Sequence, residues 1–568
     1  MSVSNAKREN AASAAVTNGL AAAGTGSREP SPKQLRIAIV NPDYPCGVFT
    51  YHYGLEILNG PVRSSIQTGA LPTLAGLLDP RHDIGVFDEA VAPLDLDELA
   101  GFDVVAVTGM IVQKTRVLEL LAALHGKAPR VVLGGPLVTA EEHLFTGKCD
   151  AIFIGEADET WPAFIEDLAA GRPTATRYEQ AERTDMSKVP VPRFDLLDNT
   201  RYETVSVQFS RGCPFLCEFC DIIVMFGRRP RTKPAENVIA ELTAARAAGY
   251  RSCFLVDDNF IGNKAAAKEL LRAIIDWQEG YATKMGFSTE ASVNLAEDEE
   301  LMSLMVKAGF TQVFVGIESP NAAALLETRK VQNVRAGSLL SRVQRIRHSG
   351  LIVRAGFIVG FDVDTPRIFE EQFEFISAAA IPVATVSILS PLPTTPLHKR
   401  LQEEGRLVEH DLLCGFEPAL MSRDELKSGA RKLVARLYDP DNFFDRVFRS
   451  FDGPEEFRAG IMQDRARRRA GTGWLTRLDT ARLCWRLAAT AFRLGHGRVL
   501  AAYLRNWPRN LALGDVALSS RDFVRLCILH WHQYRLAQGE TRSNWFQANR
   551  PQGKKVPLAA TPAGAAAE

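Results

Sequence analysis

The stretch SRGCPFLCEFCD, residues 210–221, places three cysteines within eight positions, although the whole chain of 568 residues has only nine. They are Cys213, Cys217 and Cys220, in the spacing C-x3-C-x2-C. Thiolates at such short spacing are typical of metal sites, because sulfur is a soft ligand for zinc and for iron–sulfur clusters. The six other cysteines are isolated from one another, which does not make a disulfide framework and indicates a reducing compartment.

The number of cysteines distinguishes a zinc site from an iron–sulfur cluster. A closed zinc site takes four ligands, so a fourth Cys or His would have to lie nearby. Between Thr200 and Gly262 the only further candidate is Cys253, inside an apolar strand pattern. Three thiolates on a four-iron cube leave one iron open, where a reacting molecule can bind. The spacing therefore predicts a 4Fe-4S cluster whose fourth ligand is a substrate or a cofactor.

The cysteine loop follows the first of six strand patterns that alternate with helical patterns over residues 190–405. The strand patterns are TVSVQF, SCFLVDD, MGFSTEA, QVFVGIE, LIVRAGFIVGF and VATVSILSP. A full parallel barrel has eight β/α repeats, so six repeats predict a partial (βα)6 barrel. Active residues of such a barrel are expected at the carboxyl ends of its strands, where the cysteine loop lies.

Residues 35–175 alternate in the same way ahead of the barrel. Five buried strand patterns, RIAIVNP, IGVFDEA, VVAVTGM, RVVLGGP and AIFIGEA, predict an α/β domain with a doubly wound, Rossmann-like parallel sheet. Ligands of such sheets bind beyond the carboxyl ends of the strands, and small residues there let a large planar ligand approach the backbone. Ordinary tight turns are the alternative. The strand-end residues are Thr108, Gly109, Met110, Gly134, Gly135, Pro136, Gly155 and Glu156.

Together these features resemble the radical S-adenosylmethionine (SAM) superfamily, whose signature is this cysteine spacing at this place in a partial barrel. The resemblance implies that the amine and carboxylate of SAM chelate the open iron. It also implies that an electron from the cluster cleaves SAM to a 5′-deoxyadenosyl radical. Phe219 occupies the position of the family's aromatic residue that packs near the adenine.

Polar residues at the other strand ends fit the same interpretation, because strand ends converge on one mouth of a barrel. With Phe219, the predicted SAM-binding residues are Asp257, Asp258, Asn259, Glu290, Glu318, Gly360 and Asp362. For any one of them, a role as a loop cap is the alternative. The superfamily pattern of two glycines and a glutamate after the second strand is absent, and VDDNF stands in its place, so the residue that contacts the SAM amine is not assigned.

A doubly wound domain ahead of such a barrel resembles the cobalamin-binding class of radical SAM enzymes. The resemblance places cobalamin over the eight strand-end residues of the first sheet. Many cobalamin proteins ligate cobalt through a D-x-H-x-x-G motif. The nearest stretch here is DPRHDIG, which has one residue too many, and we expect its His82 to be a surface histidine in a turn.

Further stretches narrow the resemblance. SRGCPFLCEFCDI, FGRRPRTK, VDDNFIGNK and PLPTTPLHKRLQEEGRL, with a helical C-terminal region, look like the group that includes the hopanoid 2-methylase and its lipid- or tetrapyrrole-modifying relatives. The resemblance implies methylation of an unactivated carbon in an apolar substrate, with a hopanoid lipid as the first candidate. The implied cofactors are a 4Fe-4S cluster, SAM and cobalamin, with an external electron donor.

Other functions stay open. One is a radical SAM oxidative cyclase or methylase that acts on a tetrapyrrole, and another is a cobalamin-binding sensor with a structural cluster. A methylthiotransferase fits less well, because the N-terminal domain of that class carries its own cysteine cluster and only Cys46 and Cys149 lie in this one. No catalytic side chain is assigned from the sequence.

Over residues 406–548 the strand patterns stop and the sequence becomes helical. Eleven arginines lie between Arg465 and Arg509, with Trp, Phe and Tyr residues interleaved. Three interpretations stay open for this region: peripheral contact with an anionic membrane, a solvated face over a helical core, or RNA binding. Nucleic acid is the least favoured, since the net charge of the chain is zero.

Composition and hydropathy also bear on the two ends of the chain and on its location. Residues 1–34 and 549–568 are rich in Ala, Ser, Gly and Pro, so we expect a disordered lead-in and tail. The sequence shows no unbroken apolar run long enough to span a bilayer. We expect a cytoplasmic protein, at most peripheral to the cytoplasmic membrane.

Overall fold

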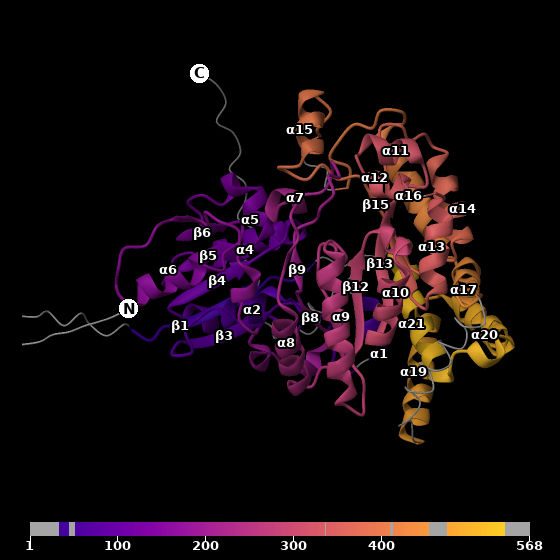
Figure 1. Ribbon diagram of the computed structural model, residues 1–568, viewed down its shortest axis with the longest axis horizontal. Coiled ribbons are helices and arrows are strands. Elements are labelled where there is room, and N and C mark those ends of the chain that lie inside the picture. Colours follow the sequence, from indigo (N-terminus) through magenta and orange to yellow (C-terminus); the bar gives the residue numbers. More distant parts are fainter. Residues whose placement is uncertain are drawn as a thin grey trace, which may run out of the picture.

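The structure is a computed structural model, and it describes residues 33–44, 51–58, 60–335, 337–408, 413–453 and 474–539. The predicted lead-in, 1–34, lies outside the described residues except for its last two, and the predicted tail, 549–568, lies wholly outside them. The described chain forms two parallel sheets side by side, with a helical region beyond the second (Figure 1). Within these ranges, no helix combines the length and the apolar character that crossing a membrane requires.

The N-terminal sheet has six parallel strands in the order β3-β1-β4-β5-β6-β7. Their bounds are β1 Arg36–Asn41, β3 Asp83–Asp88, β4 Val104–Thr108, β5 Val131–Gly134, β6 Ala151–Ile154 and β7 Arg177–Glu179. The five predicted strands are all present. The sixth, β7, is a short polar edge strand with no buried residue, so it leaves no pattern in the sequence. The strand order reverses at β1, which makes the carboxyl edge between β1 and β4 the switch point where doubly wound sheets bind ligands.

Helices cover both faces of this sheet. Alternate strand residues pack into two apolar layers, as the two-residue period of a strand requires. The helices are α2 Ala70–Gly76, α3 Leu96–Ala100, α4 Lys114–Leu124, α5 Pro136–Ala140 and α6 Thr160–Ala169. The layer that contains α2 and α6 belongs to the same buried cluster as the barrel core, so the two sheets share one continuous apolar core.

The second sheet is the partial barrel, with parallel strands in the order β15-β14-β13-β12-β11-β8-β2. The six predicted strands are β8 Tyr202–Val207, β11 Ser252–Leu255, β12 Gly286–Ala291, β13 Phe310–Glu318, β14 Ile352–Val359 and β15 Ala384–Ile388. A seventh strand, β2 (Ser64–Ile66), comes from the N-terminal part of the chain and pairs with β8. The expectation of six strands missed β2, because three half-buried residues show no periodicity.

Helices cover the outside of the barrel and surround its mouth. The outer helices are α8 Ala235–Ala247, α9 Lys264–Glu279, α10 Glu299–Ala308, α13 Leu339–His348 and α14 Ile368–Ala378. Four short helices gather at the end that holds the cysteine loop (Figure 1): α7 Ile222–Met225, α11 Ala322–Glu327, α12 Val331–Val334 and α15 Pro396–Glu403. Two short strands flank the loop along the chain: β9 Ser210–Arg211 and β10 Arg231–Thr232.

The C-terminal helices connect the two edges of the open barrel. They are α16 Arg423–Leu437, α17 Pro440–Arg449, α19 Trp474–Arg493, α20 Gly497–Ala512 and α21 Ser520–Ala537. Helix α16 lies against the edge strand β15, and α21 packs on both α16 and α1 (His52–Leu58). The Tyr438 hydroxyl donates to the Ala384 carbonyl of β15 at 2.8 Å, and His530 Nε2 of α21 lies 3.0 Å from the Tyr438 carbonyl oxygen. Because α1 precedes β2, this packing links one edge strand to the segment that carries the other.

Candidate active site

The cysteine loop is fixed at its base by a short antiparallel ladder. Strands β9 and β10 pair with each other, so the chain that enters the loop lies beside the chain that leaves it. Gly212 has φ +97°, and a Cβ at this position would lie 2.9 Å from the Gly227 carbonyl oxygen. The Cys213 N–H donates to that same oxygen at 3.3 Å. Glycine is therefore required at 212 both for its backbone conformation and for this close approach.

The three predicted cluster ligands lie on this loop, and none of the three is in a disulfide. Cys217 is buried, and Cys213 and Cys220 are half-buried. Two amide side chains donate to the sulfurs: Asn259 Nδ2 lies 3.9 Å from Cys213 Sγ, and Gln332 Nε2 lies 3.6 Å from Cys217 Sγ. Burial raises the pKa of Cys213, and it raises the pKa of Cys220 to about 12. In the described part of the chain, no three His, Cys, Asp or Glu side chains gather closely enough to hold a single metal ion.

Two of the predicted SAM residues hold the cysteine loop by its backbone. Asp257 Oδ1 accepts from the Phe209 N–H at 3.0 Å and also from the Ser210 N–H. Asp258 Oδ2 accepts from the Gly212 N–H at 2.7 Å. Burial raises the pKa of Asp257 to about 7 and that of Asp258 to about 6. These contacts are those of loop caps, the alternative that the sequence left open.

Glu318 and Lys330 form a buried ion pair beside the thiols. Glu318 ends β13 with φ +63°, an uncommon conformation for a residue with a Cβ. Lys330 Nζ lies 5.8 Å from the ring centroid of Phe219. Burial alone would lower the pKa of Lys330, but the Glu318 carboxylate and the nearby Cys217 outweigh burial and raise it. Lys330 was not predicted, because a single lysine in a loop carries no periodic or spacing signal.

Glu290 faces the interior of the barrel. It lies on the side of β12 opposite the core residues Phe287 and Ala291. Burial, together with the nearby carboxylates of Asp258 and Glu318, raises the pKa of Glu290 to about 7. Three of the predicted strand-end carboxyls thus lie close enough to interact, as expected for strands that converge on one mouth.

Gly360 and Asp362 follow β14 and have local partners. Gly360 has φ +105°, and its N–H donates to Asp364 Oδ2 at 2.8 Å. Asp362 accepts from Arg400 Nη1 at 2.6 Å and from Arg406 Nη2 at 2.5 Å. Arg400 belongs to α15 and Arg406 lies just after it, so Asp362 ties this segment to the end of β14.

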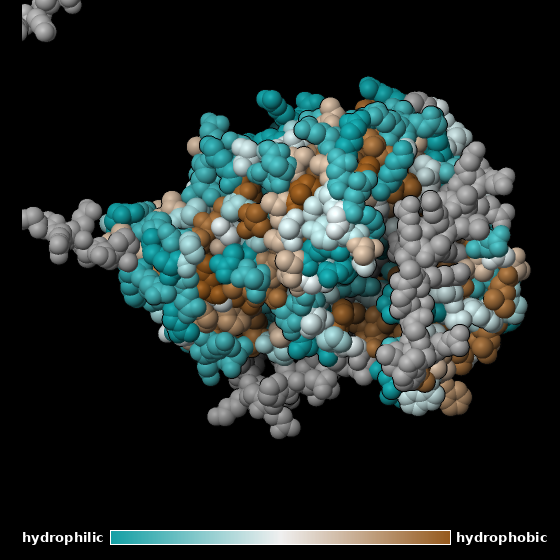
Figure 2. Space-filling model, turned by 60° about the horizontal axis from the view of Figure 1, so that its bottom comes forward, coloured by the Kyte–Doolittle hydropathy of each residue, from teal (hydrophilic) through white to brown (hydrophobic). Residues whose placement is uncertain are grey.

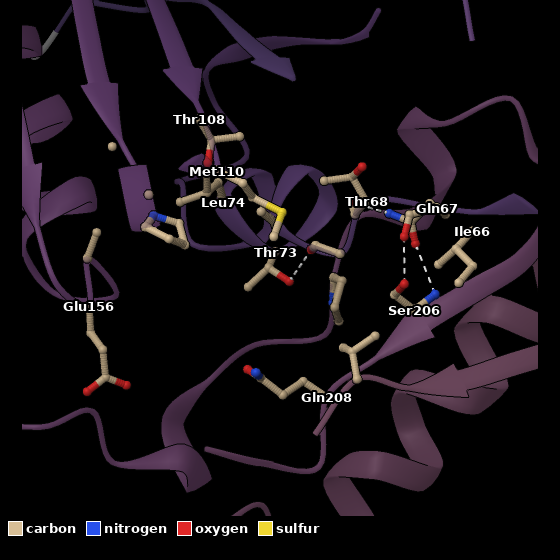
Figure 3. Close-up of a pocket in the computed structure, with 18 of the residues that line it drawn as sticks. Ile66, Gln67, Thr68, Thr73, Leu74, Thr108, Met110, Glu156, Ser206 and Gln208 are labelled. Atoms are coloured by element: carbon tan, nitrogen blue, oxygen red, sulfur yellow. Dashed lines mark hydrogen bonds between the residues drawn. The ribbon is translucent and has the colours of Figure 1, made fainter. Parts of the chain in front are cut away.

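A cavity of about 660 Å³ lies between the carboxyl ends of the N-terminal sheet and the barrel strands β2, β8 and β11 (Figure 3). Seven of the eight predicted cobalamin residues line it: Thr108, Met110, Gly134, Gly135, Pro136, Gly155 and Glu156. The eighth, Gly109, does not. A Cβ at Gly109 would lie 2.8 Å from Val117 Cγ2, so this glycine makes room for helix α4.

The facing wall of the cavity comes from β2 and β8, while α2 adds residues beside Met110, and none of these residues was predicted. Ser206 Oγ donates to the Gln67 carbonyl at 2.6 Å, and the Gln67 side-chain oxygen accepts from the Ser206 N–H at 3.3 Å. Thr73 Oγ1 donates to the Gly69 carbonyl at 2.8 Å. Figure 3 shows Gln208 on the far side of the cavity from Met110 and Leu74. Recognising this wall depends on β2, which the sequence does not reveal.

Glu156 lines the cavity, but its carboxylate is already paired. Arg211 Nη1 donates to Glu156 Oε1 at 2.8 Å and to Asp158 Oδ2 at 2.7 Å. Arg231 Nη2 donates to the same Glu156 oxygen at 3.0 Å, and the Thr184 N–H donates to the other oxygen at 3.2 Å. Because Arg211 and Arg231 lie on β9 and β10, these ion pairs join the base of the cysteine loop to the end of β6.

The expectation that His82 lies at the surface is wrong. Its side chain is 0% exposed. His82 Nδ1 accepts from the Leu35 N–H at 3.2 Å, and Nε2 lies 3.4 Å from Glu166 Oε1. The imidazole thus supplies hydrogen bonds where α6 covers the amino ends of β1 and β3. This is the edge of the sheet opposite the cavity.

Comparison with known proteins agrees with this geometry. The family profile of the Radical SAM superfamily matches residues 207–376, and the profile "Domain of unknown function (DUF4070)" matches residues 395–512. An uncharacterized methyltransferase of Synechocystis sp. is 38% identical over 428 residues, which cover 73% of this chain and 78% of that protein. The hopanoid C-2 methylase of Rhodopseudomonas palustris is 33% identical over 415 residues, which cover 72% of this chain and 78% of that protein.

Solved structures match the fold of both sheets. The radical SAM methyltransferase TsrM from Kitasatospora setae, with cobalamin and a [4Fe-4S] cluster bound, superposes with a TM-score of 0.56 at 16% sequence identity. The superposition covers 77% of this chain and 99% of that chain. The chain therefore belongs to the radical SAM superfamily, in the methyltransferase family that includes the hopanoid C-2 methylase, and it shares the fold of the cobalamin-dependent radical SAM enzymes.

Proposed function

We propose that this protein is a cobalamin-dependent radical SAM methyltransferase that adds a methyl group to an unactivated carbon of an apolar substrate, a hopanoid lipid. The cavity carries this proposal, because one of its walls is the carboxyl edge of the doubly wound sheet and the other includes β8, which leads into the cysteine loop. A ligand in the cavity would thus lie between two sites that the reaction needs together. The 33% identity to the hopanoid C-2 methylase supports the class of substrate.

The cysteine loop has the donor set for a 4Fe-4S cluster with one open iron. We propose that Cys213, Cys217 and Cys220 hold three corners of the cube. Asn259 and Gln332 already donate to two of the sulfurs, which is the outer-shell support that ligating groups need. The cation of Lys330 lies near the thiols and would offset the negative charge of a thiolate-bound cluster.

We propose that SAM lies in the barrel mouth, against Phe219 and the carboxyls of Glu290 and Glu318. Glu290 faces the barrel interior, and Glu318 ends β13 in its ion pair with Lys330. A carboxylate has several acceptor sites, so both can accept hydrogen bonds from an amine or from ribose hydroxyls. The other predicted residues, Asp257, Asp258, Asn259, Gly360 and Asp362, would act by holding loops in position, since their side chains or backbone are bonded to neighbouring segments.

The first sheet offers cobalamin a flat, open edge. Gly155 has φ +71°, and no described atom lies within 4 Å of the position of a Cβ, so this strand end faces open space. Thr108, Met110, Gly134 and Pro136 continue the edge along the neighbouring strands. When bound, the cluster would supply an electron from an external donor to SAM and cobalamin would carry the methyl group, while the protein positions them and excludes water.

Labelled methyl transfer tests this function. The protein, reconstituted anaerobically with iron, sulfide and cobalamin, would be given SAM with a deuterated methyl group, a hopanoid extract and a reductant. We expect the deuterated methyl group in a hopanoid, and the C217A variant should give none. Lipid profiles of a deletion strain provide the same test in cells, through loss of a methylated hopanoid.

The alternatives give other products in the same assay. A deuterated methyl group found in a tetrapyrrole would show that the substrate is a tetrapyrrole and not a hopanoid. An oxidised tetrapyrrole without the label would indicate a cyclase. A sensor with a structural cluster would form no 5′-deoxyadenosine at all. Each of these results would overturn the hopanoid methyltransferase.

A further inference from the structure

Helix α19 has apolar residues on two opposite sides. On one side, Leu487 and Ala491 are buried against the rest of the C-terminal helices. On the other side, Leu478, Trp485 and Phe492 recur at intervals of seven residues, so they lie along one face of the helix. Trp485 is 72% exposed and Phe492 is 79% exposed. A merely solvated face would carry polar side chains at these positions.

Helix α20 repeats this arrangement. Its buried side is formed by residues such as Val499, Ala502 and Tyr503. Its outer side carries Leu504, which is 69% exposed, and Leu511, with Ala501 and Pro508 exposed between and beside them. The spacing of three, four and three residues keeps these positions on one face of the helix. Figure 2 shows hydrophobic residues at the surface on the right, in the region where Figure 1 places α20.

The charge around these faces has one dominant sign. From 474 to 512 the chain has seven arginines and a single acidic residue, Asp479. Arg493 and Arg498 are exposed at the two ends of the turn that joins α19 to α20, on either side of the exposed Leu494. Arg505 is also exposed, and it reaches Asp441 of α17 at 3.2 Å. Exposed apolar stripes beside cations are complementary to a partner that has an apolar interior and anionic groups at its surface.

We propose that the exposed faces of α19 and α20 dock on an anionic lipid bilayer. Trp485, Phe492 and Leu504 would enter the interface between headgroups and acyl chains, and Arg493 and Arg498 would meet anionic headgroups. RNA is disfavoured because the outermost side chains are aliphatic as well as aromatic, and aliphatic groups offer bases neither stacking nor hydrogen bonds. Membrane docking follows from the exposed apolar side chains and the nearby arginines. Its use, access to an apolar substrate dissolved in the membrane, rests on the proposed function.

Vesicle binding tests the proposal with the full-length protein and without turnover. The protein would be sedimented with vesicles of phosphatidylcholine alone and with vesicles that contain phosphatidylglycerol. We expect binding to the anionic vesicles, weakened at least about tenfold in the W485S/F492S variant and in the L504S/L511S variant, because each removes apolar surface. Replacement of Arg493 or Arg498 by Gln should weaken it about fivefold each.

Matched controls separate this surface from general stickiness. L326S/L420S removes two similarly exposed leucines from α11 and from the segment before α16, and it should bind vesicles as the native protein does. Quenching of tryptophan fluorescence by brominated lipid should fall in W485F. The proposal would be overturned by equal binding to both kinds of vesicle, or by an equal loss of vesicle binding in the L326S/L420S control. It would also be overturned if the native protein were an oligomer that the α19 and α20 variants dissociate. If the α19 and α20 variants lose vesicle binding but still methylate solubilised hopanoid, membrane docking is supported and the proposed function is not contradicted.

Discussion

The guanidinium of Arg211 donates to the carboxylate of Glu156, with Nη1 2.8 Å from Oε1 and both side chains buried. Arg211 lies on β9, at the entrance to the cysteine loop, and Glu156 follows β6 of the N-terminal sheet. A charged contact therefore connects the two parts of the active site, and the cavity lies directly beside it.

Removal of the Arg211 cation should destabilise the protein strongly. R211M removes the cationic partner of Asp158 and one of the two cations at Glu156, and breaking a buried ion pair costs about 3–5 kcal/mol. Thermal unfolding and urea denaturation would measure the loss. R367A breaks the exposed Arg367–Glu371 pair and should cost less than about 1 kcal/mol. Equal effects of the two variants would contradict the role of Arg211 as a buried connection.

The three loop cysteines should decide iron content, and the other cysteines should not. C213A, C217A and C220A are each expected to lose the visible absorbance and most of the iron after anaerobic reconstitution, because each thiolate would hold one of the three iron corners that the protein ligates. C484A removes an exposed cysteine on α19 and should retain full iron content. An intact cluster in C217A would exclude the proposed ligand set.

Lys330 and Glu318 should be coupled energetically. K330M leaves the Glu318 carboxylate buried without its counter-ion, so we expect a loss of about 3–5 kcal/mol in the free energy of unfolding. K330M/E318Q should recover part of that loss, and the double-mutant cycle gives the coupling energy. In the reconstituted protein, K330M should also lower the reduction potential of the cluster, since a nearby positive charge favours the reduced form. Additive effects would show that the two residues act independently.

The pH dependence of stability should change when Asp364 is neutralised. Burial raises the pKa of Asp364 from the ordinary value of 3.8 to about 7. The folded state then holds this proton more tightly than the unfolded state, so the free energy of unfolding falls as pH rises from about 4 to about 7 and levels off above. D364N keeps an oxygen for the Gly360 and Phe361 N–H groups but cannot ionise.

Unfolding temperatures between pH 5 and 8 would test this linkage. D364N should lose stability less steeply than the native protein across this range, by up to about 2.7 kcal/mol. Hydrogen bonds from Ser187 lower the pKa of Asp185, so D185N removes a carboxylate that stays charged across this range and should follow the native slope. If the unfolding temperatures of D364N and of the native protein change with pH in parallel, Asp364 does not titrate in this window.

The sequence predicts the central strands of the first sheet well because they are buried on both faces. RIAIVN and VVAVT form runs of buried residues, and such runs are the mark of parallel strands covered by helices. By contrast, β2 and β7 have three residues each, none of them buried. Their pairing is determined by the strands beside them, so no local pattern could reveal β2 or the cavity wall that it builds.

The site divides in the same way. The spacing of Cys213, Cys217 and Cys220 is a local signal and is visible in the sequence. The partnership of Arg211 with Glu156 joins residues 55 positions apart, and only the folded chain brings them together. Gly109 shows a further limit: a glycine at a strand end can serve a ligand or a helix, and only the structure shows that this one makes room for Val117.

Bulk added at Met110 should block the cavity without harming the fold. Met110 lines the cavity at the end of β4 and is exposed, so M110W would place an indole over the edge where we propose cobalamin. Cobalamin retained after gel filtration, read from its visible absorbance, should fall at least about tenfold, since an occluded site forfeits the contacts of a large ligand. V112W adds the same side chain two residues away, at an exposed position that does not line the cavity, and should retain cobalamin fully. Both variants should keep the native unfolding temperature, because neither position is buried. Equal cobalamin binding by M110W and V112W would place the cofactor elsewhere.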